Sequence, residues 1–354
     1  MFIITALLSL ALANPTPENT QSELELGEKV TPDYIINGSE ASEDDFPMTG
    51  GMLLRGEAFG FPLEMFVCSS TLIAPDTVLI AAHCLDTNAL TAGIPMDEME
   101  IYWTRQPDLT SWDGTQQSPE LPTDAIKAVD WVLHEDFDLQ SLQIGLAENS
   151  DIALIFLSEP VLDIEPAYLP TAAEAASLAE GDLVFVVGWG QQIATGFQEM
   201  PPDGSYAIKM QGESHISMIA EYEFKVGEEE DDVRKCHGDS GGPSFWEGDD
   251  GLRLIGVTSH AYDNTDCFQT GGVDTRVDYF FDWIDDNMVS RCEDGTRVWC
   301  EETGIISPNY FSEDDDDLVD EEEDKGLFSC ASAASELLFY LPLIGFLGIT
   351  RRRA

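Results

Sequence analysis

The chain has 354 residues, enough for a large core, and its 16 Lys and Arg residues against 68 Asp and Glu residues give a formal net charge of -52. This charge repels nucleic acid and anionic membranes, which argues against a nucleic-acid partner. Much of the acid has a simpler explanation than a binding site, because a carboxylate-rich surface keeps a protein hydrated in concentrated salt.

The first predicted element is a secretory signal over residues 1–13. The start, "MFIITALLSLALANP", is a short apolar run that ends in Ala11-Leu12-Ala13, the small-x-small pattern of a signal-peptidase site. Residues 14–34 are polar and acidic with little apolar periodicity, which predicts a linker or propeptide. The protein is therefore expected to be exported.

Export bears on the seven cysteines. In an oxidising compartment, seven cysteines predict three disulfides and one cysteine that is not part of an internal pair. There is no C-x-x-C motif, so no metal site and no cofactor are expected.

From Ile35 the chain is predicted to be all-β. Short runs rich in β-branched and aromatic residues, "VLIAAH", "IALIFL", "LVFVVGWG" and "LIGVTSH", recur between Gly, Pro and Asp clusters, which is typical of a barrel or sandwich. Only "YFFDWIDDNMV", ending at Val289, is predicted as a helix. Together these elements predict one domain over residues 35–290.

Three segments follow this domain. Residues 291–312 are predicted as a small extension in which Cys292 and Cys300 close a loop, and residues 313–329 as an acidic, disordered stalk. Residues 330–354 combine Cys330 among small residues, an apolar run and a final arginine cluster. This tail resembles bacterial sorting signals, which are held in the membrane until a sorting protease cuts them; the alternative is a permanent membrane anchor.

Ser240 in "KCHGDSGGPSF" is either a nucleophile or a turn residue. A serine nucleophile needs an imidazole to take its proton, an anion to orient that imidazole and N–H donors for the oxyanion. "LIAAHCLD" offers His83 and "ENSDIALIFL" offers Asp151. Each alone could be structural, as a core imidazole and a strand cap, but together they predict a catalytic triad.

These motifs resemble the chymotrypsin-like (trypsin family) serine endopeptidases, with His, Asp and Ser in that chain order. "IING" resembles the mature N-terminus, "AAHC" the histidine motif, "DIAL" the aspartate motif, and "GWG" and "GDSGGP" the later signatures. "GGVDTRV" followed by "WI" resembles the closing strand and helix. The resemblance implies two six-stranded antiparallel β-barrels with a C-terminal helix and the site between the barrels.

The resemblance also implies residue roles. Ser240 attacks the peptide carbonyl, His83 carries the proton, Asp151 orients the imidazole, and the N–H groups of Gly238 and Ser240 bind the oxyanion. Asp239 pairs with the amino group that cleavage releases at Ile35. The implied disulfides are Cys68 with Cys84 and Cys236 with Cys267, which leaves Cys292 with Cys300.

The chain departs from the family pattern at its activation and substrate-binding positions. Tyr34 precedes Ile35 where Arg or Lys is usual, so the activating protease must tolerate an aromatic residue. The substrate strand has Ser259, His260 and Ala261 in place of Ser-Trp-Gly; His260 serves either recognition or simply an exposed loop.

Substrate preference is predicted from the position six residues before the nucleophile, at the pocket floor. Arg234 occupies it, with Lys235 beside it, which favours acidic residues before the scissile bond over basic ones. The alternative is that Asp274, after Gly272 and Val273, pairs with Arg234 and leaves a short pocket for small or apolar residues.

Two functions are consistent with these motifs. The first is a secreted or surface-displayed endopeptidase, made as a zymogen, with protein or peptide substrates and an activating protease as partners. The second is a protease-like binding module without activity. The intact His83, Asp151, Ser240 and Gly238 favour the endopeptidase.

Overall fold

The computed structural model describes residues 35–58, 61–87, 97–114, 118–140, 142, 144–193, 202, 204–229, 231–248, 250–263, 267 and 269–308. The predicted signal peptide, the acidic segment that ends at Tyr34, the stalk and the tail with Cys330 lie outside these residues. Within the described ranges no helix is both long and apolar enough to span a bilayer.

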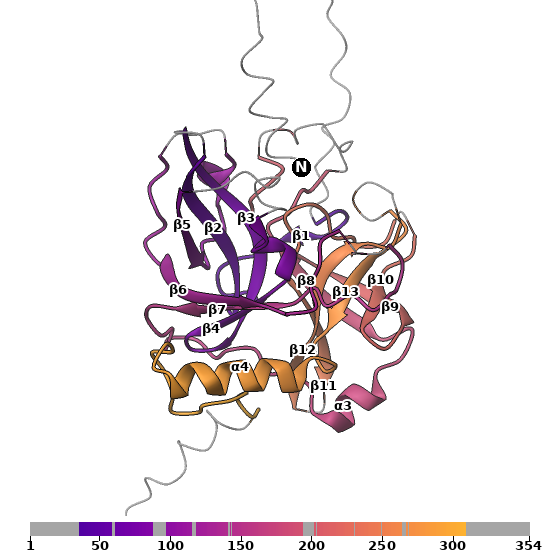
Figure 1. The fold of residues 1–354 in the computed structure, drawn as a ribbon. Helices are drawn as coiled ribbons and strands as arrows, with labels where there is room; N and C mark the ends of the chain where they lie inside the picture. The colour runs from indigo at the N-terminus through magenta and orange to yellow at the C-terminus, as the bar shows by residue number, and fades with distance from the viewer. Residues whose placement is uncertain are drawn as a thin grey trace, which may run out of the picture. The chain divides into compact units, whose positions relative to one another are not determined.

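The first half of the described chain forms a closed antiparallel barrel (Figure 1). In order around the barrel its strands are β2 (Thr49–Ala58), β3 (Phe61–Ala74), β4 (Thr77–Ile80), β7 (Ala153–Leu157), β6 (Ile126–Leu133) and β5 (Asp97–Thr104). Strands β4 and β7 are buried at every residue, as their unbroken apolar sequences predict.

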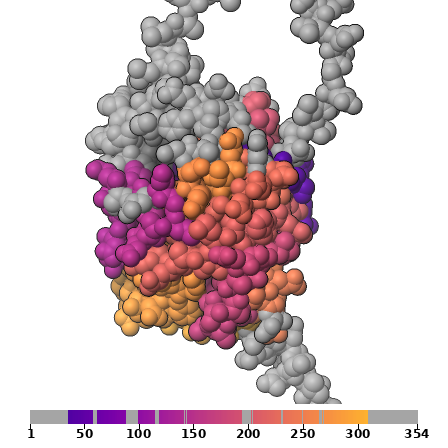
Figure 2. All heavy atoms as spheres, turned by 90° about the vertical axis from the view of Figure 1, so that its right-hand side faces the viewer, coloured from indigo at the N-terminus to yellow at the C-terminus, as the bar shows by residue number. Residues whose placement is uncertain are grey.

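The second half forms another six-stranded antiparallel ring. Its strands, in order, are β8 (Leu183–Gly188), β9 (Met210–Ile219), β10 (Glu223–Val226), β13 (Gly272–Arg276), β12 (Gly251–Ala261) and β11 (Pro243–Gly248), which returns to β8. The short β1 (Ser39–Glu40) adds to the outside of this ring by pairing with β9. The prediction of two six-stranded barrels is confirmed. In Figure 2 this second barrel, in salmon and orange, faces the viewer.

The predicted C-terminal helix is confirmed as α4 (Phe281–Glu293). Its inward residues Ile284 and Met288 are fully buried and join a core cluster that includes Leu154 of the first barrel. The helix therefore packs the C-terminal part of the described chain against the first barrel (Figure 1).

The prediction of a single helix was incomplete. A short helix, α3 (Ala172–Ser177), follows Thr171, whose hydroxyl accepts from the N–H of Glu174 while the Glu174 carboxylate accepts from the N–H of Thr171. This reciprocal pair is a capping box, and its Thr-x-x-Glu signature is readable in the sequence. Two short 3₁₀ helices, η1 (Ala82–Cys84) and η2 (Thr110–Trp112), also lie in the first half of the described chain.

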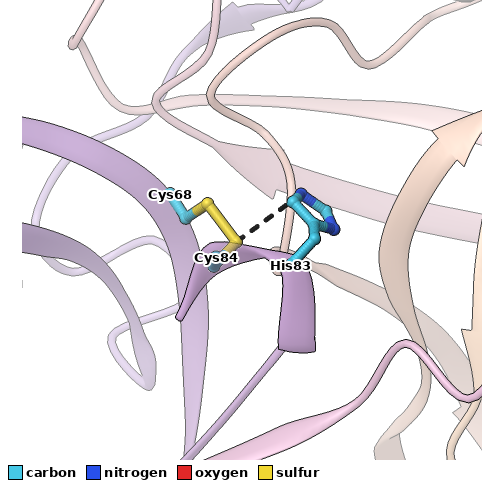
Figure 3. A group of neighbouring side chains, drawn as sticks. All are labelled: Cys68, His83 and Cys84. Carbon is cyan, nitrogen blue, oxygen red and sulfur yellow. Dashed lines mark hydrogen bonds between the residues drawn. A yellow bond between two sulfur atoms is a disulfide. The ribbon is translucent and has the colours of Figure 1, made fainter. Parts of the chain in front are cut away.

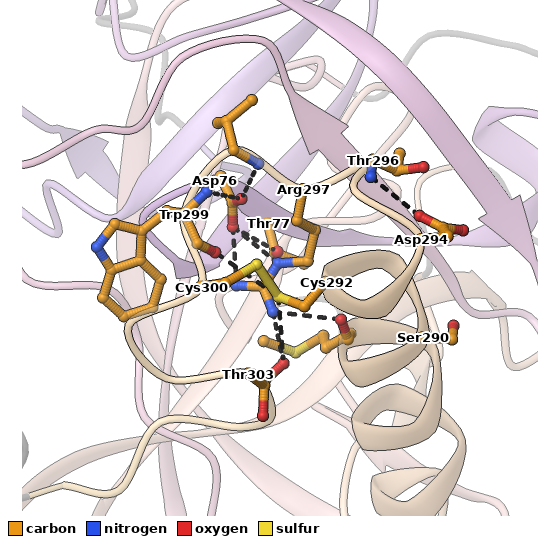
Figure 4. Close-up of a disulfide and its surroundings, with 12 residues drawn as sticks. Asp76, Thr77, Ser290, Cys292, Asp294, Thr296, Arg297, Trp299, Cys300 and Thr303 are labelled. Carbon is orange, nitrogen blue, oxygen red and sulfur yellow. Dashed lines mark hydrogen bonds and ion pairs between the residues drawn. A yellow bond between two sulfur atoms is a disulfide. The ribbon is translucent and has the colours of Figure 1, made fainter.

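The small extension after α4 is fastened to the first barrel by a buried ion pair (Figure 4). Cys292 and Cys300 form the predicted disulfide. Within the loop that it closes, Arg297 donates from Nε and Nη2 to Asp76 Oδ1 at 3.0 and 2.9 Å, and both side chains are 0% exposed. The other oxygen of Asp76 accepts from the N–H groups of residues 298 and 299, so this carboxylate is fully engaged.

Candidate active site

His83 and Asp151 meet where the two barrels face each other. His83 lies in the turn η1, directly after β4, and Asp151 lies two residues before β7, the strand that pairs with β4. His83 Nδ1 is 2.7 Å from Asp151 Oδ2, and the backbone N–H of His83 donates to Asp151 Oδ1 at 2.8 Å. The carboxylate thus holds both the ring and the backbone of the histidine.

The charges of this pair support each other. Burial raises the pKa of Asp151, but the charge and hydrogen bonds of His83 and the hydroxyl of Ser259 outweigh it and hold the pKa below its ordinary 3.8. Burial lowers the pKa of His83, but Asp151 outweighs this and raises it above 6.5. Because Asp151 is a carboxylate and can only accept, the Nδ1 of His83 carries a proton and Nε2 is left as the basic nitrogen.

Ser259 completes the surroundings of the carboxylate. Its hydroxyl donates to Asp151 Oδ2 at 2.6 Å. The register between β12 and β13 shifts between Thr258 and His260, which makes Ser259 the extra residue of a bulge. A bulge re-aims a side chain out of the ordinary alternation, and here it directs Ser259 at the buried acid.

Ser240 lies on a tight turn that is bonded to the first barrel. The N–H of Ser69 lies 3.0 Å from the carbonyl oxygens of both Gly238 and Ser240, and the Ser69 hydroxyl donates to Gly238 O at 2.9 Å. Ser69 follows Cys68, which is disulfide-bonded to Cys84, the neighbour of His83. The serine is thereby placed on the histidine side of the interface. Among the described residues no hydrogen bond joins Ser240 to His83, a contact that commonly forms only with substrate bound.

Figure 3 shows His83 beside the Cys68–Cys84 disulfide. His83 Nε2 is 3.7 Å from Cys84 Sγ. The sulfur atoms and the imidazole are close enough to suggest a metal site, but both sulfurs are spent in the disulfide and supply no thiolate ligand. The group is therefore a packed imidazole beside a disulfide, and it leaves Nε2 without a competing proton donor.

The predicted oxyanion donors have the required backbone. Gly238 has φ 100°, and a Cβ added there would overlap Tyr206 and Gly190, so only glycine fits. Within the described ranges neither the N–H of Gly238 nor that of Ser240 donates a hydrogen bond. Both donors are therefore available to a substrate oxygen.

Asp239 is buried within this turn. Its two oxygens accept from the N–H groups of Gly190 and Cys236, each at 2.8 Å. Burial raises its pKa to about 6. Ile35 is 1% exposed and packs into the core of the second barrel, and Ile36 bridges to Arg234, so this segment lies against the same region.

The predicted pocket residues come together on adjacent strands, with one correction. Ala261 of β12 pairs with Gly272 of β13, as expected for two walls of one pocket. Asp274 does not pair with Arg234. Both of its oxygens accept from Lys235 Nζ, at 2.8 and 2.7 Å, and this pair is 0% and 3% exposed. The alternative in which Asp274 pairs with Arg234 was wrong, because the adjacent residue, Lys235, binds this acid.

His260 is also corrected, since it is not an exposed loop residue. It lies on β12 with its side chain 11% exposed. Its Nδ1 is 3.0 Å from Ser259 Oγ and 3.9 Å from Glu223 Oε1, and its Nε2 is 3.2 Å from Gly145 O. Sequence reasoning missed Glu223 altogether. Its sequence signal is an acid at the head of a short strand that also contains a lysine, Glu-Phe-Lys-Val.

The fold and this site define a chymotrypsin-like protease domain. The model of the family described as Trypsin matches residues 35–284. Because that match covers more than half of the chain, the protein belongs to the trypsin family of serine proteases.

Individual relatives are more distant. The chain is 27% identical over 295 residues to phenoloxidase-activating factor 1 of Holotrichia diomphalia, covering 79% of this chain and 76% of that protein. It is 25% identical over 283 residues to a tryptase of Mus musculus, covering 73% and 90%. It is 25% identical over 264 residues to brachyurin of Leptuca pugilator, covering 71% and 96%.

Proposed function

We propose that the protein is a serine endopeptidase that hydrolyses peptide bonds through an acyl-enzyme at Ser240. The observation that carries the proposal is the hydrogen-bonded pair of His83 and Asp151 beside the Ser240 turn. The described site has a base held in one tautomer, a hydroxyl on the same side of the interface, and two free N–H donors. Membership of the trypsin family supports peptide substrates.

In the proposed mechanism, Nε2 of His83 removes the proton from Ser240 Oγ as the oxygen attacks the substrate carbonyl. The charge that develops on the carbonyl oxygen is bound by the N–H groups of Gly238 and Ser240. His83 then returns its proton to the leaving amine, and water attacks the ester by the same route. Asp151 stays ionised and stabilises the imidazolium, as its lowered pKa favours.

Covalent labelling tests this function. A fluorophosphonate should label Ser240 in the mature protein, and the label should be lost in Ser240→Ala and His83→Ala. Correctly processed protein that neither labels nor cleaves any member of a peptide library would establish the second function, a protease-like binding module.

The protein is proposed to be exported and activated by cleavage after Tyr34. Two burials support this, since Ile35 and the acid that would receive its new amino group, Asp239, are each 1% exposed. An activating protease that accepts an aromatic residue is the implied partner. N-terminal sequencing of active enzyme should read Ile-Ile-Asn-Gly, and any other start would contradict the proposed activation site.

The preference is proposed to be for acidic residues before the scissile bond. Arg234 and Lys235 place two positive charges at this position, and Asp274 pairs with Lys235 and not with Arg234. Cleavage of a peptide library should be depleted after Lys and Arg. An acidic preference that persisted in Arg234→Ser would rule out the role assigned to Arg234.

The C-terminal tail stays a proposal, because it lies outside the described residues. We propose that it is a membrane-retained signal with Cys330 close to a sorting cut, and that a permanent anchor is the alternative. Mass spectrometry of the surface protein decides between them: loss of Arg353 supports processing, and a retained Arg353 supports the anchor.

A further inference from the structure

The segment that leads into Asp151 is fastened to the second barrel by one buried carboxylate. Glu223, the first residue of β10, is 0% exposed. Its Oε2 accepts from the N–H of Ala147 at 2.7 Å, and its Oε1 accepts from Asn149 Nδ2 at 2.9 Å. Both partners are donors only at these atoms, so the ionised carboxylate is the form that satisfies both.

His260 holds the same segment from the neighbouring strand. Its Nε2 lies 3.2 Å from Gly145 O, while the N–H of Gly145 donates to Tyr262 O at 2.8 Å. The carbonyl oxygen of Gly145 can only accept, so Nε2 of His260 carries a proton. Burial lowers the pKa of His260 below its ordinary 6.5, so the imidazole is neutral and its acceptor nitrogen, Nδ1, lies 3.0 Å from Ser259 Oγ.

The Glu223 carboxylate lies 3.9 Å from Nδ1 of His260, so the two side chains are neighbours in this buried site. The two residues thus reach Asp151 by two routes, through the backbone of residues 147–149 and through Ser259. Neither route is part of the proposed triad.

We propose that Glu223 is a positioning residue of the active site, whose ionised carboxylate holds residues 145–149, and through them Asp151, in the catalytic arrangement. The proposal rests on the proposed peptidase function. Glu223 does not touch the reacting atoms; it acts through Asn149, Ala147 and His260.

Protonation of Glu223 should release this segment. Protonation removes the negative charge and turns one of the two accepting oxygens into a hydroxyl, a poorer acceptor, so the bonds to Ala147 and Asn149 weaken. Burial raises the pKa of Glu223 to about 7, and the nearby Asp151 and Asp274 add to the rise, against the two hydrogen bonds that lower it. The other titratable groups that face the pair are His83, on the far side of Asp151, and His260 itself. The catalytic arrangement therefore depends on a second deprotonation, besides that of His83, near neutral pH.

The test is the pH profile of kcat/KM for the mature enzyme, from pH 5 to 9, on one peptide substrate. In the wild type two groups must lose protons, so the acid limb of log kcat/KM should approach a slope of two. In Glu223→Gln the slope should be one and the plateau about 10-fold lower, because a displaced catalytic group lowers the rate. Glu223→Asp should restore the second deprotonation.

The matched control is Glu174→Gln. Glu174 is another buried acid that accepts a backbone N–H and faces a cation, Arg253, but it caps α3 and does not contact the site. The Glu174→Gln variant should be less stable than the wild type, but the acid limb of its log kcat/KM profile should keep a slope of two. Equal slopes in Glu223→Gln and the wild type, or equal loss of slope in the control, would overturn the proposal.

A second measurement uses the unsubstituted Glu223, in case Glu223→Gln does not fold. In the Ser240→Ala protein, the hydrogen-exchange protection of the Ala147 amide, corrected for intrinsic rate, should fall as pH drops through about 7. Constant protection would overturn the proposal. Wild-type enzyme that neither labels nor cleaves would instead overturn the peptidase function, and this proposal with it, whereas active enzyme with an unchanged variant profile overturns this proposal alone.

Discussion

Asp239 carries a buried charge whose cost should depend on whether the chain has been cut after Tyr34. In the intact chain its carboxylate is 1% exposed and accepts only two backbone N–H groups, from Gly190 and Cys236. Replacing it in Asp239→Asn removes the charge and keeps the shape. The amide loses one acceptor, but that cost does not vary with pH, so the comparison concerns pH dependence alone.

The magnitude follows from the pKa, which burial raises from 3.8 to about 6. A pKa difference of about 2 units corresponds to a change of about 3 kcal/mol in the free energy of unfolding, because each unit contributes about 1.36 kcal/mol. Because the folded-state pKa is raised, the stability is fully present below pH 3.8 and is lost as pH rises through about 6. The intact wild type should therefore lose about 3 kcal/mol more than intact Asp239→Asn between about pH 4 and pH 8.

Urea unfolding of both proteins at the two pH values measures this, in a Ser240→Ala background that prevents self-digestion. Cleavage after Tyr34 should reverse the sign, since an ammonium at Ile35 favours the ionised carboxylate and stabilises the cut form at pH 8. Other titrating groups are common to both proteins and cancel. An identical pH dependence of intact wild type and intact Asp239→Asn would refute the reasoning.

Three further outcomes are expected. Ser259→Ala should lower kcat/KM about 10-fold with little change in KM, because Asp151 loses a charge-assisted hydrogen bond, and the Michaelis parameters of the purified variant check this. Arg297→Met should lower the free energy of unfolding by about 3 kcal/mol, since the fully buried Asp76 keeps its charge without its ion partner; urea unfolding measures the loss, and a neutral result would contradict it. Gly238→Ala should reduce kcat/KM at least about 100-fold through the displaced oxyanion donor, and an active variant would exclude Gly238 from that role.

Much of the fold was predictable because several strands appear in the sequence as short runs of apolar, β-branched residues. β4 and β7 are unbroken apolar runs, and the helix α4 follows a periodic segment. The positions of His83 and Asp151 beside each other also follow once these two strands pair.

The remaining contacts were not predictable because they join residues that only strand register brings together. Glu223 meets Asn149 across 74 positions, and Arg297 meets Asp76 across 221. The chain has 68 Asp and Glu residues, and no local pattern distinguishes these buried acids from the solvated ones. The helix α3 is a different case, since its capping box was visible and was overlooked.

The register of β13 shows why the alternative, in which Asp274 pairs with Arg234, was wrong. On β13, Asp274 stands opposite Thr258 of β12 and Phe224 of β10, which directs its side chain into the barrel. Lys235 reaches the same interior, where it also donates to Ser244, and burial makes the ion pair obligatory because either charge alone would be costly there. Since Asp274 pairs with Lys235, that acid does not cancel the charge of Arg234, and the proposed preference for acidic substrates rests on Arg234 and not on Lys235.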